Sequence, residues 1–278
     1  MNNIVRLSPD GKQSRASISA LAAALCAVIL VAAAAPANAA GSNVYTALGD
    51  SLAFGAFAPI GGGYVPLYEK YVQKDTGTAT QLLSLGIPGW QSADLRNGIH
   101  RGPLFRLSIF YSNVVTWNIG GNDLNSARNK YKDGTCGGPL NQDCLLAAVS
   151  SFKSNWDVIL NDLFALRRSR LTAFRTMTIY NPFVREDQES DTWSGDGGMT
   201  DFQAVKPYLD AVNDYIKGTS AAAGVLVAPV YESFNGPAGD EDAATKGLLS
   251  FDEFHPNEAG HALMALLLKE LGYAAIVP

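Results

Sequence analysis

Three side chains in this sequence have the types that nucleophilic catalysis requires: Ser51, Asp252 and His255. A serine hydroxyl is a poor nucleophile near neutral pH, so it needs a base to take its proton, and the base needs an acidic partner to hold its tautomer. Asp252 and His255 are three residues apart, so one local turn can bring the carboxylate to the imidazole. The set predicts a serine hydrolase with Ser51 as nucleophile, His255 as base and Asp252 as acid.

Each of these segments also has a purely structural interpretation. Residues 49–51 have ordinary turn composition. Asp252 and His255 precede Pro256 and could merely open the last helix. Residues 120–123 could be a turn that ends a strand. Their occurrence in one chain, each at the edge of a predicted strand or helix, favours the catalytic interpretation.

The elements that must position these residues alternate between strand and helix. Short apolar, β-branched runs predict strands at 43–48, 81–85, 113–119, 173–180 and 224–230. Helical apolar spacing predicts helices over 64–73, 93–110, 145–168, 202–222 and 257–271. This order predicts a parallel sheet with right-handed crossovers and helices on both faces. Ligands of such sheets bind beyond the carboxyl ends of the strands, where Ser51, Gly86, Gly89 and Asn122 follow strands.

These motifs together resemble the sequence blocks of the SGNH, or GDSL, hydrolase family. The resemblance rests on residues 49–52 (Gly-Asp-Ser-Leu), Gly89, residues 120–123 (Gly-Gly-Asn-Asp) and residues 252–256 (Asp-Glu-Phe-His-Pro), which occur in family order. It implies a flavodoxin-like three-layer α/β/α sandwich around a mainly five-stranded parallel sheet. It also implies hydrolysis of esters through an acyl-enzyme.

Carried over by this resemblance, the nucleophile falls on Ser51, the acid on Asp252 and the base on His255. The oxyanion hole falls on the backbone N–H groups of Ser51 and Gly89 and the side-chain amide of Asn122, groups that can stabilise the charge of a tetrahedral intermediate.

Two residues depart from the family pattern around Gly89. Ser84 stands where the family often has Asn, which leaves Gly86 as a rival oxyanion donor. Trp90 stands where the family often has a small polar residue, and it could wall the acyl pocket, although a tryptophan more often belongs to a core.

Composition and charge exclude several other classes of function. The 278 residues are 47% hydrophobic and 17% charged, which is typical of a globular protein. The formal charge is −5 and no run is rich in Lys or Arg, so we expect no nucleic-acid partner. Glycine-rich nucleotide-binding motifs are absent from the sequence, and we expect no cofactor and no metal. Nothing in the sequence demands more than a monomer.

The first 39 residues have the pattern of a secretory signal peptide. Arg6, Lys12 and Arg15 form a basic region, residues 21–35 are an unbroken apolar run, and residues 36–39 are small residues suited to cleavage. The apolar run is shorter than the roughly 18 residues that a spanning helix needs. We therefore expect a hydrolase domain over residues 40–278, secreted or periplasmic, without a stable membrane anchor.

Two cysteines, Cys136 and Cys144, remain after this leader and flank a segment of loop composition. In an oxidising compartment we expect them to form a disulfide. The alternatives are two reduced thiols or half of a zinc site, but metal-ligand spacing is absent and the chain has only 3 histidines.

The function that these observations favour is that of a secreted serine esterase or lipase acting on a small-molecule, lipid or acylated-glycan ester. A carbohydrate O-acetylesterase or a thioesterase would use the same residues, and a non-catalytic secreted binding protein would use the same fold. The polar segment 181–200 is either a rim that shapes substrate access or a surface excursion.

Overall fold

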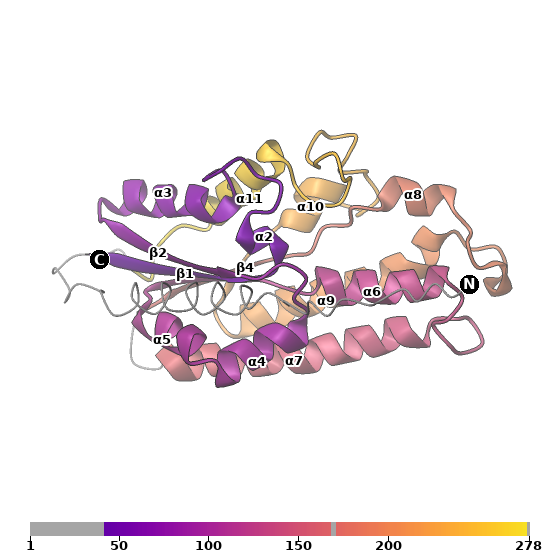
Figure 1. Ribbon diagram of the computed structural model, residues 1–278, viewed down its shortest axis with the longest axis horizontal. Helices are drawn as coiled ribbons and strands as arrows, with labels where there is room; N and C mark the ends of the chain where they lie inside the picture. The colour runs from indigo at the N-terminus through magenta and orange to yellow at the C-terminus, as the bar shows by residue number, and fades with distance from the viewer. Residues whose placement is uncertain (1–41, 168–170, 277–278) are drawn as a thin grey trace, which may run out of the picture. The chain divides into compact units, whose positions relative to one another are not determined.

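The computed structural model describes residues 42–167 and 171–276, and the predicted signal peptide lies outside them. A sheet of five parallel strands forms the centre, in the order β2-β1-β3-β4-β5 (Figure 1). The strands are β1 (Asn43–Gly49), β2 (Thr80–Gly86), β3 (Val114–Asn118), β4 (Ala173–Met177) and β5 (Leu226–Ala228).

The sheet register brings the carboxyl ends of the three strands β2, β1 and β3 level with one another. Gly49, the last residue of β1, lies opposite Gly86 of β2 and Asn118 of β3. All residues of β3 and β4 are buried, as expected for inner strands covered on both faces. The residues that follow these strands therefore meet at one edge of the sheet.

One face of the sheet is covered by α2 (Ser51–Phe54), α3 (Tyr64–Thr76), α10 (Val230–Asn235) and α11 (Glu258–Glu270). The core on this side joins Tyr45 and Val114 of the sheet to Tyr68 of α3 and Met264 of α11. On this face α3 and α11 also pack against each other.

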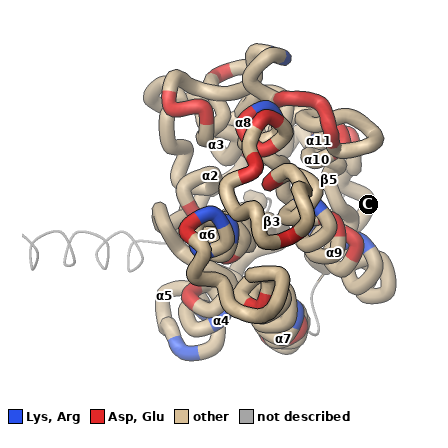
Figure 2. The backbone as a smooth tube through the Cα atoms, turned by 90° about the vertical axis from the view of Figure 1, so that its right-hand side faces the viewer, with Lys and Arg blue, Asp and Glu red and all other residues tan. Residues whose placement is uncertain are grey.

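The opposite face is covered by α4 (Ser92–Arg101), α5 (Pro103–Tyr111), α7 (Asp143–Arg167) and α9 (Asp201–Ala222). Its core joins Val115 and Trp117 of β3 to Trp156 of α7 and Val212 of α9. Figure 2 shows the two helix layers end-on, above and below the strands. The predicted three-layer α/β/α sandwich with a five-stranded parallel sheet is confirmed.

Three helical segments differ from the sequence prediction. The single helix predicted over 93–110 is two helices, because Gly102 and Pro103 end α4 and start α5. Residues 120–123 do not form a simple turn but begin α6 (Gly121–Lys132). The polar segment 181–200 contains α8 (Val184–Glu189) and a short 3-10 turn (Ser194–Asp196).

Candidate active site

Ser51 lies at a sharp turn from strand to helix. It is the first residue of α2, directly beyond β1, and is 7% exposed. The Asp50 carboxylate caps this helix by accepting a hydrogen bond from the Leu52 backbone N–H at 3.0 Å. The cap fixes the turn that holds Ser51 at the carboxyl edge of the sheet.

Asp252 and His255 form the local turn that their spacing predicts. Asp252 Oδ2 lies 2.6 Å from His255 Nδ1, and Asp252 Oδ1 accepts hydrogen bonds from the backbone N–H groups of Phe254 and His255. Glu253 adopts the left-handed conformation, with φ of 52°, which closes the turn. The carboxylate thus orients the imidazole from within the same loop.

The structure brings this turn to Ser51, although the two segments are 204 residues apart in sequence. His255 Nε2 lies 3.0 Å from Ser51 Oγ, so serine, imidazole and carboxylate form one hydrogen-bonded line. A bridge between Leu249 and Pro256 holds the base of the loop, and the Ser250 backbone N–H donates to the His255 carbonyl at 2.8 Å. The three residues are therefore placed as a nucleophile, base and acid require.

Aromatic rings enclose His255 on two sides. The ring of Phe57 is stacked on the imidazole with centroids 4.9 Å apart, and the ring of Phe254 meets it edge-on at 4.7 Å. The His255 side chain is consequently only 16% exposed. The two rings therefore shield the hydrogen bonds of His255 to Asp252 and Ser51 from water.

The pKa values of the Asp252 and Asp50 carboxylates are shifted in opposite directions. Partial burial favours the neutral form of Asp252, but hydrogen bonds from the His255 side chain and from two backbone N–H groups outweigh it and hold the pKa below its usual value. Burial raises the pKa of Asp50 to about 6, against the hydrogen bonds that Leu52 and Asn118 donate to it. Asp252 is therefore ionised at neutral pH. Asp50, in contrast, changes its protonation state near pH 6.

Gly89 and Gly86 have different structural reasons for being glycine. Gly89 follows Pro88 in a turn closed by a hydrogen bond from the Trp90 N–H to the Ile87 carbonyl, and its φ of 81° favours glycine. Among the described residues, its own N–H has no hydrogen-bond partner. A Cβ on Gly86 would lie 2.3 Å from the Phe54 nitrogen, so Gly86 is required for close packing of α2 on the sheet.

Asn122 stands in the first turn of α6, near the carboxyl end of β3. Its Nδ2 donates a hydrogen bond to the Trp90 carbonyl at 2.9 Å, which ties α6 to the turn that contains Gly89. The Trp90 indole itself is stacked on Phe105, with centroids 5.3 Å apart, and contacts Gly98. The indole therefore belongs to the packing around α4 and α5 rather than to a substrate pocket.

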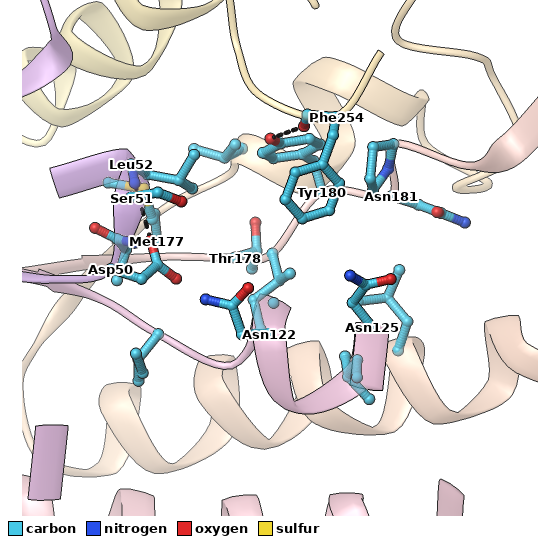
Figure 3. A pocket seen from close by; sticks show the side chains of 18 of the residues that line it. Asp50, Ser51, Leu52, Asn122, Asn125, Met177, Thr178, Tyr180, Asn181 and Phe254 are labelled. Carbon is cyan, nitrogen blue, oxygen red and sulfur yellow. Dashed lines mark hydrogen bonds between the residues drawn. The ribbon is translucent and has the colours of Figure 1, made fainter. Parts of the chain in front are cut away.

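A largely apolar pocket opens beside Ser51 and Asn122 (Figure 3). Its wall comes from α6, α9, the end of β4 and the segment that follows β4; its apolar members include Leu124, Met177, Ile179, Phe183, Val205 and Leu209. Of the described residues, Ser51 and Asn122 belong to the lining, whereas His255, Gly89 and Trp90 do not. The pocket therefore extends from the nucleophile on the side of Asn122.

A group of charged side chains surrounds Arg128, which lines the pocket from α6. Arg128 of α6 makes a paired hydrogen bond with Asp187 of α8, and its guanidinium lies 3.7 Å from the centre of the Phe183 ring. Lys132 contacts Glu186, Asp187 and Asp201. We call these five charged residues the ionic end, and Ser51, Asp252 and His255 the catalytic end. No motif in the sequence indicates the ionic end.

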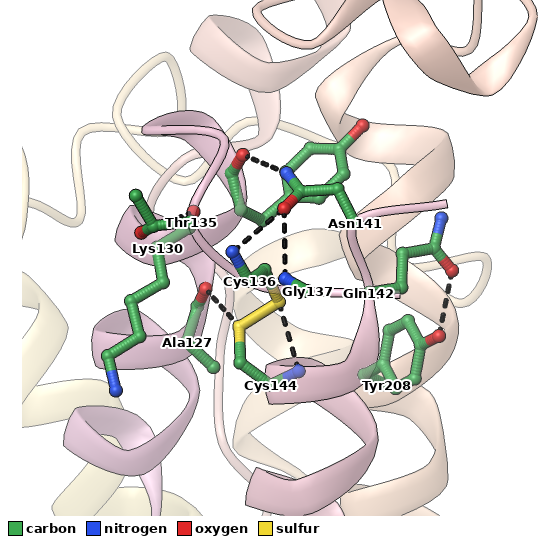
Figure 4. Close-up of a disulfide and its surroundings, with 10 residues drawn as sticks. Ala127, Lys130, Thr135, Cys136, Gly137, Asn141, Gln142, Cys144 and Tyr208 are labelled. Carbon is green, nitrogen blue, oxygen red and sulfur yellow. Dashed lines mark hydrogen bonds between the residues drawn. A yellow bond between two sulfur atoms is a disulfide. The ribbon is translucent and has the colours of Figure 1, made fainter. Parts of the chain in front are cut away.

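A disulfide joins Cys136, in the loop between α6 and α7, to Cys144 in the first turn of α7 (Figure 4). Asn141, inside this loop, accepts hydrogen bonds from the N–H groups of Cys136 and Gly137 and donates to the Tyr131 carbonyl. Cys136 and Tyr131 share a small core with residues of α7 and α9. The cross-link thus holds the C-terminal end of α6 against the neighbouring helices.

His261 and Asp123 are buried and engaged in structural hydrogen bonds. His261 Nδ1 accepts from the Tyr64 N–H, and its Nε2 lies 3.1 Å from the Ala56 carbonyl oxygen. Asp123 accepts from the N–H and the hydroxyl of Ser92. Within the described ranges, no group of three or more His, Cys, Asp or Glu side chains could hold a metal ion.

A family model matches most of the chain. The model described as GDSL-like lipase/acylhydrolase family matches residues 47–263. The chain belongs to this family, as the sequence motifs indicated, and it is a hydrolase that acts on ester bonds. No curated protein sequence matches the chain significantly.

Solved structures with the same fold include several ester hydrolases. The lipase Lip_vut3 from a goat rumen metagenome matches with a TM-score of 0.68 at 22% identity, over 83% of this chain and 98% of that one. A putative GDSL-like lipase from Parabacteroides merdae matches with a TM-score of 0.58 at 16% identity, over 84% and 96% of the two chains. A mutant of Axe2, an acetyl-xylooligosaccharide esterase from Geobacillus Stearmophilus, matches with a TM-score of 0.57 at 16% identity, over 84% and 95%.

No helix in the part of the chain that the structure describes is both long enough and apolar enough to span a membrane.

Proposed function

We propose that this protein is a secreted serine esterase or lipase that cleaves carboxylic esters through an acyl-enzyme on Ser51. One observation carries the proposal: Ser51 Oγ, the His255 imidazole and the Asp252 carboxylate form a continuous line with contacts of 3.0 and 2.6 Å. Both distances lie within the range that proton transfer requires.

In the proposed reaction, His255 Nε2 takes the proton of Ser51 as its Oγ attacks the ester carbonyl. The imidazolium then gives this proton to the departing alkoxide oxygen, which leaves an acyl group on Ser51. A water molecule, deprotonated by His255, attacks the acyl carbon, and His255 returns the proton to Ser51 as the acid departs. Asp252 keeps the imidazole in the tautomer that presents Nε2 to the serine and stabilises its charged form.

Three donors are proposed to stabilise the negative oxygen of the tetrahedral intermediate: the N–H groups of Ser51 and Gly89 and the Asn122 amide. The N–H groups of Ser51 and Gly89 have no partner among the described residues, which supports this role. Asn122 lines the pocket beside Ser51, and its link to the Trp90 carbonyl draws the Gly89 turn towards α6. The packing requirement at Gly86 supports Gly89 as the donor.

Export is the second part of the proposal. The basic, apolar and small-residue regions of residues 1–39 support cleavage by a signal peptidase. The disulfide between Cys136 and Cys144 supports maturation in an oxidising compartment. Expression of the full chain in a secreting host, followed by N-terminal sequencing of the protein in the medium or periplasm, tests this: retention of residue 1 would contradict it.

Hydrolysis of 4-nitrophenyl acetate, butyrate, octanoate and acetylated xylooligosaccharides tests the reaction. We expect wild type to cleave at least one ester and Ser51→Ala to lose at least about 10⁴-fold in kcat while keeping its melting temperature. Ser154→Ala, an exposed serine-to-alanine change on α7, is the matched control. Equal turnover by folded Ser51→Ala and wild type would refute the proposal.

A further inference from the structure

Most polar groups in the pocket are engaged with other groups of the protein. Asn118 donates to Asp50 through Nδ2 and accepts from the Tyr64 hydroxyl through Oδ1. The Thr178 hydroxyl accepts from the Tyr231 N–H at 2.8 Å. Arg128 is paired with Asp187. These groups have no hydrogen-bonding need that a substrate must meet.

Asn125 is an exception. It lines the pocket from α6, and its Oδ1 is buried without a hydrogen-bond partner among the described residues. Figure 3 shows its amide beside the cavity, with the amides of Asn125 and Asn122 both projecting from α6 towards Thr178. A buried amide oxygen without a partner is costly, and an apolar side chain of similar volume would suit this wall better. The amide of Asn125 is therefore available to hydrogen-bond a group that enters the pocket.

The part of the ester that reaches Asn125 follows from the proposed mechanism. The leaving oxygen must lie near His255, which protonates it, while the carbonyl oxygen must lie near Asn122. The pocket is lined by Asn122 and, within the described chain, not by His255. The alcohol therefore departs on the side of His255, and the acyl chain enters the pocket.

We infer that Asn125 is a specificity-determining residue that hydrogen-bonds an oxygen substituent on the acyl chain, so that the preferred substrates are hydroxyacyl esters. A hydroxyl both donates and accepts, so it can pair with either end of the amide after rotation about the terminal torsion. This inference rests on the proposed function, because it takes the ester orientation from it.

Helix geometry sets the position of this substituent. Asn122 and Asn125 are three residues apart on α6, so they share one face with their Cβ atoms roughly 5–6 Å apart. With the carbonyl oxygen near Asn122, the hydroxyl belongs on a carbon beyond the second of the acyl chain. Unsubstituted chains can still enter, because the wall is largely apolar and its other polar groups are already paired within the protein.

A matched substrate series tests the inference on the wild-type chain. We compare 4-nitrophenyl hexanoate with its 3-hydroxy and 6-hydroxy derivatives and expect kcat/KM to be about tenfold higher for at least one hydroxy ester, the gain of one neutral hydrogen bond. Absence of preference for both hydroxy esters would overturn the inference. Failure of wild type to cleave all three, or equal cleavage by Ser51→Ala, would instead refute the proposed function.

Variants then assign the preference to Asn125. Asn125→Leu should abolish the hydroxy preference and melt at the same or a higher temperature, because the unpartnered oxygen is gone. Asn129→Leu, an exposed change one turn further along α6, should keep the preference. Asn125→Ser serves as a second variant. A retained preference in the Asn125 variants, or a lower melting temperature for Asn125→Leu with the preference unchanged, would show a structural asparagine and overturn the inference.

Discussion

The catalytic end and the ionic end are held together in different ways. At the catalytic end, Asp252 and His255 come from one turn, and one hydrogen bond connects this turn to Ser51. At the ionic end, the charges come from α6, α8 and the start of α9, and Arg128 and Asp187 are 59 residues apart. The side chains of His255 and Asp252 are 16% and 24% exposed, whereas the Asp187 side chain is only 1% exposed.

Because of this difference, we expect substitutions at the catalytic end to lower turnover and substitutions at the ionic end to lower stability. Removing a hydrogen bond at the catalytic end should stop turnover and leave the fold in place, because the loop keeps its backbone bonds and its bridge. Removing the charge of Asp187 at the ionic end leaves the buried Arg128 guanidinium without its main partner, which destabilises the whole domain. Each prediction below tests one side of this comparison.

Asp252→Asn should produce the largest effect, a loss on the order of 10⁴-fold in kcat, because an amide can hold the imidazole in the wrong tautomer. Steady-state rates on a 4-nitrophenyl ester measure it, and circular dichroism checks the fold. The control is Glu253→Gln, since the neighbouring carboxylate is exposed and its ion pair with Arg185 lies outside the proposed catalytic residues. Near-normal turnover in folded Asp252→Asn would remove Asp252 from the mechanism.

Asp187→Asn should destabilise the domain by about 3–5 kcal/mol, because it leaves the buried Arg128 guanidinium without its main partner. Urea unfolding measures the change, and kcat per folded molecule should fall far less than in Asp252→Asn. Glu186→Gln is the matched control: Glu186 contacts the same arginine but its side chain is 55% exposed, so we expect a cost below about 1 kcal/mol. Equal losses of unfolding free energy in Asp187→Asn and Glu186→Gln would contradict a special role for the buried Arg128–Asp187 pair.

Asp50→Asn should make unfolding less dependent on pH. Burial raises the pKa of Asp50 from 3.8 to about 6, so the folded protein holds this proton more tightly than the unfolded chain. The resulting stability is fully present below the unfolded pKa and is lost as the pH rises through the folded pKa. The variant should therefore gain, relative to wild type, on the order of 3 kcal/mol between pH 4 and pH 7.

Urea titrations of both proteins at several pH values measure this gain. Asn can accept the hydrogen bonds from Leu52 and Asn118 through its own oxygen, so the turn is preserved. Parallel pH profiles for the two proteins would show that Asp50 does not titrate in this range.

Loss of the disulfide should produce the smallest effect. Replacing Cys136 and Cys144 by Ala opens a loop with a sequence separation of only 8, for which loop-closure entropy predicts about 2–3 kcal/mol. Thermal unfolding with and without a reductant measures it: wild type should shift towards the variant when reduced. Since the cross-link lies beyond the ionic end, kcat should stay within about twofold of wild type.

The features that sequence patterns predicted are those whose partners are close in sequence or whose apolar spacing is regular. The five strands and the Asp252–His255 turn belong to this group. The family resemblance added Gly89 and Asn122, and their oxyanion role stays a prediction. The fold can be predicted from the sequence because strands and helices that alternate along a chain have few ways to pack.

The ionic end was missed because its signal is spread over distant, polar segments. In α6 the buried residues Leu124, Ala127 and Tyr131 do have helical spacing, but charged and amide side chains between them hide it. In α8 the buried Asp187 looks like any surface carboxylate until Arg128 is brought to it. Trp90 stands next to the motif residue Gly89, which suggested a place in the substrate pocket. Its ring instead packs against Phe105.

Ser51 and His255 are 204 residues apart in sequence, so they are synthesised at very different times. Under the proposed mechanism, the nucleophile leaves the ribosome early and its base follows with one of the last loops of the described chain. A growing chain that stops short of that loop would lack the Ser51–His255 pair. Turnover by the proposed mechanism therefore requires that the first and last parts of the domain have docked.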